Sequence, residues 1–228
     1  MIDRSLAELP LFKGLSDAQL AVVQAGMSRI SLDAGEPLFA QGDVATRFFM
    51  LLDGRLKVSQ VNEEGRQIIV RIVHPSELCG FAPALGRESY PGSSEAIVGS
   101  RLLAWPRSRW EPVLGAAPSL AISAIQAVGR KLDEAHTRLR EMTTEEAGQR
   151  IANLLLRLIR DSGEVEGDRA SIPFPLTRQD IADMSGNTIH TVSRIMAGWE
   201  ARGVLARARR KVIVADMPAL RAISEISG

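Results

Sequence analysis

Residues 176–200 read LTRQDIADMSGNTIHTVSRIMAGWE, and this stretch decides the fold of the C-terminal part of the chain. A short helix from about Arg178 to Met184 is predicted to end at the Ser-Gly-Asn sequence of residues 185–187, because a glycine turn interrupts the helical pattern there. Asn187 or Thr188 is suited to cap a second helix with its side-chain oxygen. The stretch therefore predicts two helices joined by a tight turn.

The two faces of the second predicted helix differ in chemistry. The face that anchors the helix to its domain is apolar and consists of Val192, Ile195, Met196 and Trp199. The other face is polar or small and consists of His190, Ser193, Arg194 and Ala197. A helix–turn–helix needs this division, with one face packed and the other free to enter the major groove of DNA. The pattern predicts binding to double-stranded DNA.

Several side chains in and after this stretch suit contacts to DNA. Arg194 can donate two hydrogen bonds to guanine O6 and N7, worth about 1–3 kcal/mol of base discrimination, and Ser193 and His190 can reach neighbouring base edges. Hydroxyl, amide and backbone N–H groups at the start of the first helix can meet phosphate. The predicted DNA-contacting residues are Thr177, Arg178, Gln179, Thr188, His190, Ser193, Arg194, Arg209 and Lys211.

Arg209 and Lys211 belong to a basic segment that follows the second helix. Residues 204–205 and 212–214 are typical of two strands of a wing, and residues 207–211 form its basic tip. The formal charge of the chain is only +1, yet residues 190–214 carry six basic side chains against one acidic side chain. A solvated surface is the alternative explanation of such a charge run, and the wing explains it better.

The N-terminal half has a different pattern. Through residues 30–105, short apolar runs alternate with glycine-containing turns at intervals of about 7–11 residues, which is typical of an all-β sandwich or barrel. Asp53 and Gly54 lie between two such runs and predict a type I′ hairpin turn. Residues 16–27 predict a short helix that begins at a Ser16 cap.

Beyond residue 118 the apolar residues recur at alternating spacings of three and four. This seam consists of Ile125, Val128, Leu132, Ala135, Leu139 and Met142. So narrow a stripe on a long helix needs a partner helix, and the heptad register predicts a parallel homodimer. Packing against the chain's own β domain is the alternative. Gly148 follows as a candidate hinge, and a wide apolar face from residue 151 predicts a buried helix.

The 228 residues are therefore predicted to form an α+β protein with three parts, namely a β domain over residues 1–116, a dimerisation helix over 117–146 and a DNA-binding domain over 147–228. One cysteine excludes an intramolecular disulfide, a Cys-only zinc site and a multi-thiolate iron–sulfur cluster. The sequence has no apolar run of membrane-spanning length and no signal-peptide core, which predicts a soluble, cytoplasmic protein. It has no catalytic motif, so an enzyme is not expected.

In this order of parts the chain resembles the CRP/FNR family of bacterial transcription regulators. Residues 34–43 (AGEPLFAQGD) and 48–58 (FFMLLDGRLKV) look like the family's cyclic-nucleotide-binding β-roll, a jelly roll, and residues 176–205 look like its winged helix–turn–helix. The resemblance implies a homodimer on a two-fold symmetric operator, an N-terminal sensor whose ligand repositions the DNA-binding domains, and RNA polymerase as a partner. Activation of transcription is the outcome it favours.

The resemblance also assigns roles to single residues of the second helix. It places Arg194 where the family contacts a half-site guanine, with Ser193 as its neighbour. His190 departs from the pattern, because the family commonly has Glu there. A Glu accepts hydrogen bonds from base amino groups, whereas a neutral His offers one donor and one acceptor. The operator is therefore expected to differ from the common one at the base that faces His190.

The sensor departs from the cyclic-nucleotide pattern. Alignment places Phe81 where the family has a ribose-binding Glu and Pro91 where it has a phosphate-binding Arg, with Arg87 as a nearby substitute. Pro has neither charge nor backbone donor, so a buried cyclic phosphate would lack its cation. An apolar effector pocket is expected instead, formed by Leu78, Phe81, Leu85, Tyr90, Ser93 and His136.

Residues 80–92 (GFAPALGRESYPG), with residues 190–194 and 199–200, resemble the nitric-oxide-responsive NnrR-type branch that regulates denitrification. That resemblance makes haem a candidate cofactor, with His74, His136 and Cys79 as candidate ligands. Each has a plainer interpretation, as a loop residue, a polar flank of the coiled coil and a small buried apolar residue respectively. Cyclic-nucleotide sensing and a Cys79 thiol switch stay open as alternatives.

Overall fold

The computed structural model describes residues 4–9, 12–65, 67–80, 82, 86–118, 122, 125, 128–129, 132–133, 135–137, 139–140 and 145–225. The chain folds into two compact units. The first holds residues 1–61 and 71–134, and the second holds residues 62–70 and 135–228.

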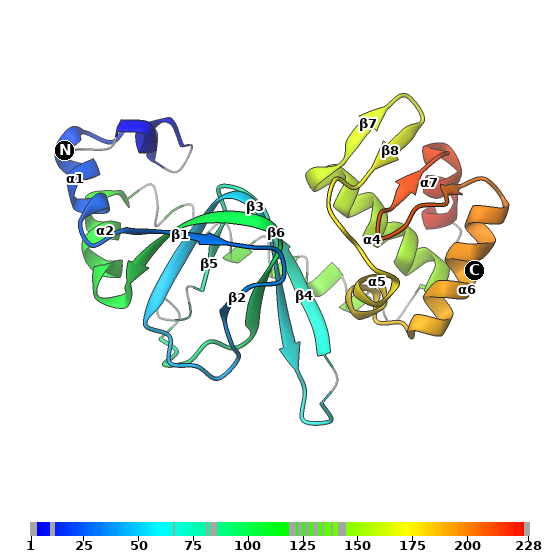
Figure 1. Cartoon of the computed structure of the whole chain (residues 1–228), viewed down its shortest axis with the longest axis horizontal. Helices are drawn as coiled ribbons and strands as arrows, with labels where there is room; N and C mark the ends of the chain where they lie inside the picture. Colours follow the sequence, from blue (N-terminus) through cyan, green and yellow to red (C-terminus); the bar gives the residue numbers. More distant parts are fainter. Residues whose placement is uncertain are drawn as a thin grey trace. The chain divides into compact units, whose positions relative to one another are not determined.

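The first unit is built around an antiparallel sheet (Figure 1). The strands of this sheet are β1 (Ser28–Leu32), β2 (Pro37–Phe39), β3 (Arg47–Val61), β4 (Gln67–Val73), β5 (Leu78–Cys79) and β6 (Ser93–Pro106), and of β4 only residues 71–73 fall within the first unit. The order is β1-β6-β3-β4, with β2 paired to β6 and β5 paired to β3. The long strands β3 and β6 therefore form the centre of the sheet. The structure confirms the predicted β-roll.

Both faces of the β3–β6 ribbon are buried, because successive side chains of a strand point to opposite sides. One face contributes Phe49 and Leu51 to an interior cluster, and the other contributes Phe48 and Met50 to a cluster that includes Trp105. The second cluster is covered by η1 (Arg4–Glu8), α1 (Asp17–Gln24), η4 (Arg107–Arg109) and α2 (Trp110–Ala116).

Helix α1 confirms the predicted cap. The Ser16 hydroxyl accepts a hydrogen bond from the Gln19 backbone N–H, and the Gln19 side chain accepts one from the Ser16 N–H. The helix ends at Gln24, earlier than the predicted boundary near residue 27. Its carbonyl at Val23 accepts a 2.6 Å hydrogen bond from the Trp105 indole, which holds α1 on the sheet.

The predicted hairpin at Asp53 and Gly54 is wrong. Strand β3 continues through both residues, and its register against β6 shifts there, as in a β-bulge. Gly54 has φ of +95°, and a Cβ at this position would lie 2.6 Å from the Gly99 carbonyl oxygen and collide with the Ser100 hydroxyl. The glycine serves a close approach of two strands rather than a chain reversal.

The described residues between 118 and 140 are all helical. The seam residues among them are exposed in the single chain, at 72% for Ile125, 55% for Leu132 and 67% for Leu139. Val128 and Ala135 are also exposed, and Met142 lies outside the described residues. These side chains are thus available to a partner helix, and the choice between that helix and the chain's own β domain stays a prediction.

Within the second unit, the described residues 145–225 combine four helices with a small sheet (Figure 1). The helices are α4 (Ala147–Ser162), α5 (Arg178–Ser185), α6 (Ile189–Ala201) and α7 (Met217–Glu225). The sheet has the order β7-β8-β10-β9, from β7 (Glu164–Glu166), β8 (Arg169–Ser171), β9 (Leu205–Ala206) and β10 (Ile213–Val214). The predicted wing is thus present, with β9 and β10 antiparallel and residues 207–211 between them.

Helix α4 has the predicted buried face, with Ile151 and Leu155 fully enclosed. Gly148 is the second residue of this helix, so the expected hinge at that position is wrong. Glu146 and Gln149 form a capping box that fixes the first turn around the glycine. Among the described residues, no helix is both long and apolar enough to cross a lipid bilayer.

Candidate nucleic-acid interface

Helices α5 and α6 form the predicted helix–turn–helix, and each is capped by a threonine. Thr177 accepts from the Asp180 N–H while the Asp180 carboxylate accepts from the Thr177 N–H at 2.8 Å. Gly186 ends α5 in the left-handed conformation, with φ of +65°. Thr188 then caps α6 by accepting from the Thr191 N–H at 3.2 Å. The hydroxyls of Thr177 and Thr188 are thus used in starting the two helices.

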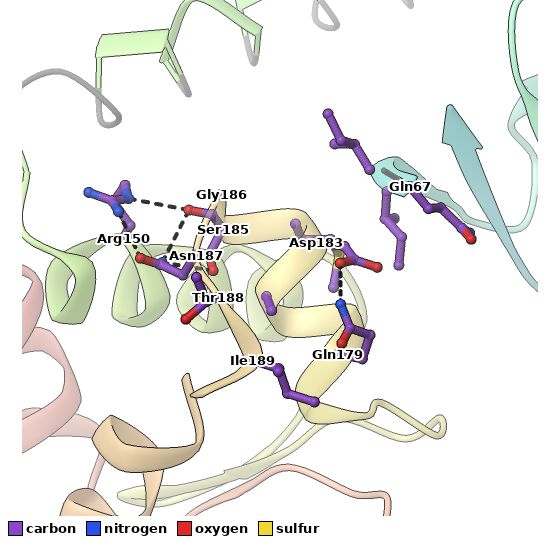
Figure 2. A pocket seen from close by; sticks show the side chains of 13 residues that line it. Gln67, Arg150, Gln179, Asp183, Ser185, Gly186, Asn187, Thr188 and Ile189 are labelled. Carbon is purple, nitrogen blue, oxygen red and sulfur yellow. Dashed lines mark hydrogen bonds between the residues drawn. The ribbon is translucent and has the colours of Figure 1, made fainter. Parts of the chain in front are cut away.

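The turn between α5 and α6 is tied to α4 by Arg150 (Figure 2). Its guanidinium donates to the Ser185 carbonyl at 3.2 Å, to Asn187 Oδ1 at 2.7 Å and to the Glu145 carbonyl at 2.6 Å. Asn187 in turn donates to the Ser185 hydroxyl at 3.0 Å. The start of the recognition helix α6 is therefore fixed by side chains from two other segments.

Helix α6 separates a packed face from an exposed one. Val192, Met196 and Trp199 are buried, as expected. His190 and Arg194 are exposed, and Ser193 between them is half-buried. The exposed face thus offers a guanidinium and an imidazole, which can donate to base edges in a major groove.

The predicted phosphate contacts at the start of α5 are already engaged within the protein. The Arg178 guanidinium donates to the Ser193 carbonyl at 3.1 Å and to Glu200 Oε1 at 2.7 Å. The Gln179 amide donates to Asp183 at 2.6 Å (Figure 2). Arg178 therefore links α5 to α6 in addition to lying near the surface.

The wing residues Arg209 and Lys211 are exposed, in accord with a cationic tip. Arg210 beside them has φ of +55°, which marks the sharp reversal of the chain between β9 and β10. Its backbone carbonyl accepts from the Leu176 N–H at 3.0 Å, so the tip is held next to the segment that leads into α5.

Sequence reasoning missed three residues of this surface. Arg150 and Glu200 were missed because their roles depend on contacts with distant parts of the chain. Ile189, the first residue of α6, is 40% exposed beside His190. An apolar side chain there is suited to contact a thymine methyl group. The position of Ile189 directly before His190 in the sequence could have predicted this contact with a base.

The expected effector pocket is only partly assembled in the described residues. Tyr90 lies in the interior cluster with Phe39 stacked on it at 4.0 Å between ring centroids, whereas Leu78 packs against the Trp105 cluster on the other face of the sheet. The Ser93 hydroxyl accepts from the Gln41 N–H at 2.9 Å, and His136 is exposed. Phe81 and Leu85 lie outside the described residues.

A stack of three aromatic rings fills the interior beside β5. Phe39 stacks on Tyr90 and also on Phe49, at 5.8 Å. Gly80 touches this stack so closely that a Cβ would lie 2.7 Å from the Phe49 ring. The Tyr90 hydroxyl donates to the Arg47 carbonyl at 2.8 Å, and burial raises the pKa of this phenol. The phenol therefore acts as a buried, neutral donor.

The three candidate haem ligands have different surroundings. Cys79 is fully buried in the interior cluster, His74 is half-buried at the turn before β5, and His136 is exposed. A haem bound through Cys79 would require that cluster to open, because its side chains enclose the thiol. Among the described residues, no group of three or more His, Cys, Asp or Glu side chains is arranged to hold a metal ion.

Two parts of the chain match models of known protein families. Residues 29–116 match the cyclic nucleotide-binding domain, and residues 149–223 match the Crp-like helix-turn-helix domain. A "Probable transcriptional activator" of Rhizobium leguminosarum bv. viciae is 30% identical over 207 residues, which cover 90% of this chain and 85% of that protein. The "CRP-like cAMP-activated global transcriptional regulator" of Mycobacterium tuberculosis is 22% identical, over 94% of this chain and 96% of that protein.

A solved structure shares the fold. FixK2 from Bradyrhizobium japonicum matches with a TM-score of 0.74 at 20% sequence identity, over 89% of this chain and 99% of that chain.

Proposed function

The chain belongs to the CRP/FNR family of transcription regulators, and from this premise we propose that it binds a two-fold symmetric operator as a homodimer and activates transcription in response to a small effector. As a member of this family, the protein is a DNA-binding regulator with an effector-binding domain, and not an enzyme. The proposal adds the assembly, the direction of control and the class of effector.

One observation carries the DNA-binding part of the proposal. Helix α6 buries Val192, Met196 and Trp199 and leaves His190 and Arg194 exposed on the opposite side, next to a cationic wing. We assign Arg194 to a half-site guanine and His190 and Ser193 to the neighbouring bases. Phosphate contacts are assigned to residues around the helix starts and the wing, namely Thr177, Arg178, Gln179, Thr188, Arg209 and Lys211.

The exposed seam supports the homodimer. Ile125, Leu132 and Leu139 lie on one helical stripe and are more than half exposed in the single chain. A second copy of the same helix would bury this stripe as a parallel coiled coil. We accordingly divide the chain into a sensor (1–116), a dimerisation helix (117–146) and a DNA-binding domain (147–228).

The sensor core supports an apolar effector rather than a cyclic nucleotide. Pro91 stands where the cyclic-nucleotide-binding members of the family have a phosphate-binding Arg. The stacked rings of Phe39 and Tyr90 fill the interior nearby. Neither feature supplies a cation for a buried phosphate. We propose nitric oxide as the effector and denitrification genes as the targets, in line with the NnrR-type resemblance. RNA polymerase is the expected partner at the promoter.

Two alternatives for sensing differ in their requirements. A cyclic nucleotide would need a substitute cation such as Arg87. A thiol switch would need access to Cys79, which is fully buried.

The effector assignment is tested with the full-length protein purified without added ligand. Absorbance and mass spectrometry identify any bound haem, and titration with nitric oxide follows both the spectrum and the affinity for duplex DNA. We expect a Soret shift together with a change in DNA affinity. A response that persists in Cys79→Ser excludes the thiol switch, whereas a response that needs no haem and disappears in Cys79→Ser supports it. A response to cyclic AMP alone would replace the proposal with cyclic-nucleotide sensing.

A further inference from the structure

Glu200 lies near the end of the recognition helix, where three DNA-facing elements meet. Its Oε1 accepts the 2.7 Å hydrogen bond from Arg178 at the start of α5, and its Oε2 lies 3.8 Å from Nε of Arg207 at the base of the wing. The Glu200 side chain is only 17% exposed. In the sequence, no other acidic residue occurs between Asp183 and Asp216.

A carboxylate at this position opposes DNA binding if it acts on its own. The DNA backbone carries a dense negative charge, so an acid among the contacting residues lowers affinity by repulsion. Its position between two guanidinium groups indicates that it acts on those cations rather than on DNA.

Arg178 holds the recognition helix α6 at two points along its length, and we call this pair of contacts the Arg178 brace. Arg178 donates through one nitrogen to the Ser193 carbonyl and through another to Glu200. Ser193 and Glu200 are seven residues apart, which is about two helical turns, so they lie on the same side of α6. The brace therefore ends at Ser193, directly beside Arg194 on the reading face.

The two arginines are held to different degrees. The Arg178 side chain is 35% exposed and makes two hydrogen bonds, whereas the Arg207 side chain is 91% exposed and approaches Glu200 without a hydrogen bond. Exposed ion pairs of the second kind are weak, so DNA phosphate and Glu200 compete for Arg207. Moving Arg178 away from α6 would require both of its hydrogen bonds to break.

We propose that Glu200 is a specificity-determining positioning residue, whose carboxylate fixes Arg178 across α6 and competes with DNA phosphate for Arg207. This inference rests on the DNA-binding function. Non-specific binding depends on the number of cations available to phosphate, whereas base reading depends on the position of the reading face. Holding Arg207 lowers non-specific binding, and holding Arg178 protects base reading.

The test compares Glu200→Gln with wild type in the full-length chain. Glu225→Gln is the matched control, because Glu225 is an exposed acid on α7 and its substitution changes the charge equally. Affinity for a mixed-sequence duplex is measured by fluorescence anisotropy at several salt concentrations. We expect tighter non-specific binding by Glu200→Gln, with a log–log salt slope steeper by about one, because each added phosphate contact contributes about −0.9. Equal slopes in Glu200→Gln and Glu225→Gln would overturn the proposal.

Two further variants identify the cation and guard against a folding defect. Glu200→Gln combined with Arg207→Gln should return the slope to the wild-type value, and an unchanged steep slope would show that Arg207 is not the cation released. Arg207→Gln in the wild-type background should change the slope by clearly less than one, because Glu200 keeps Arg207 from phosphate in that background. If Glu200→Gln does not fold, a slope that becomes shallower by about one in Arg207→Gln overturns the proposal, because it shows that Glu200 does not keep Arg207 from phosphate.

The ability of the protein to distinguish DNA sequences tests the role of the Arg178 brace. The measured quantity is the ratio of affinities for a duplex selected by the wild-type protein and for the mixed-sequence duplex. The ratio should fall in Glu200→Gln and in Arg178→Gln while thermal unfolding shows folded protein, and an unchanged ratio in both variants contradicts the brace. A wild-type protein that binds no duplex even at low salt would instead refute the DNA-binding function itself.

Discussion

Nη2 of Arg150 on α4 lies 2.7 Å from Oδ1 of Asn187, in the turn that leads into the recognition helix. The same guanidinium also donates to the carbonyl of Ser185 and, at 2.6 Å, to that of Glu145, just before α4. One side chain therefore connects the entry of the DNA-binding domain to the turn of the helix–turn–helix. The orientation of α6 depends on this connection.

Replacing Arg150 by Lys should weaken both the domain and its binding to an operator. Lysine keeps the charge but lacks the planar set of donors, so at least one of the three carbonyl or amide partners loses its hydrogen bond. We expect a loss of about 2 kcal/mol in the free energy of unfolding, measured by urea denaturation. Arg160→Lys is the control, because Arg160 is exposed on the same helix. Equal stability of the two variants would contradict the role given to Arg150.

His190→Glu should change base preference at one symmetric position of the operator. Glutamate accepts hydrogen bonds from base amino groups and cannot donate, whereas neutral histidine does both. The measurement is selection from random duplex DNA with each protein. A preference that stays the same at every position would show that His190 does not face a base.

Leu132→Glu should convert the homodimer to a monomer. The Leu132 side chain is 55% exposed in the single chain, so a charge there is harmless to the monomer and repulsive in a paired helix. Sedimentation velocity measures the change. Val165→Glu is the matched control, because Val165 is 62% exposed on β7 and outside the seam. A Leu132→Glu protein that stays dimeric would place the interface elsewhere.

Tyr90, the only tyrosine of the chain, should ionise late in an alkaline titration. Burial raises the pKa of its phenol, although the Arg47 backbone N–H donates to the phenol oxygen at 3.3 Å and opposes this shift. Above the ordinary value of about 10, the unfolded chain loses this proton while the folded chain keeps it, so stability falls as pH rises further. Tyrosinate absorbance followed with circular dichroism tests this. Ionisation near the ordinary value with the fold intact would contradict it.

The sequence predicts best those features that depend on neighbouring residues. The two helices around Gly186 and the Ser16 cap follow from local turn and capping chemistry, and the structure has both. The bulge at Gly54 was mistaken for a hairpin because the same Asp-Gly pair serves both, and only the partner strand at Gly99 and Ser100 distinguishes them.

The candidate site was predicted less completely, because its contacts join distant segments. The exposure of His190 and Arg194 follows from helical periodicity. The engagement of Arg178 by Glu200 joins residues on two helices and could not be derived from spacing. Leu78 and Tyr90 are expected in one pocket, yet they lie in different clusters. The two residues of β5, Leu78 and Cys79, point to opposite faces of the sheet, and Tyr90 lies in the cluster that contains Cys79.

Selection of duplex DNA by the full-length protein tests most directly whether a dimer reads DNA through α6. We expect the wild-type protein to enrich two inverted half-sites whose centres are about one helical turn, roughly 10 base pairs, apart. Arg194→Ala should lose the preference for one guanine in each half-site, at a cost of about 1–3 kcal/mol. Arg221→Ala on α7 should select the wild-type sequence. A wild-type selection without two-fold symmetry, or an Arg194→Ala selection identical to wild type, would contradict this reading of DNA.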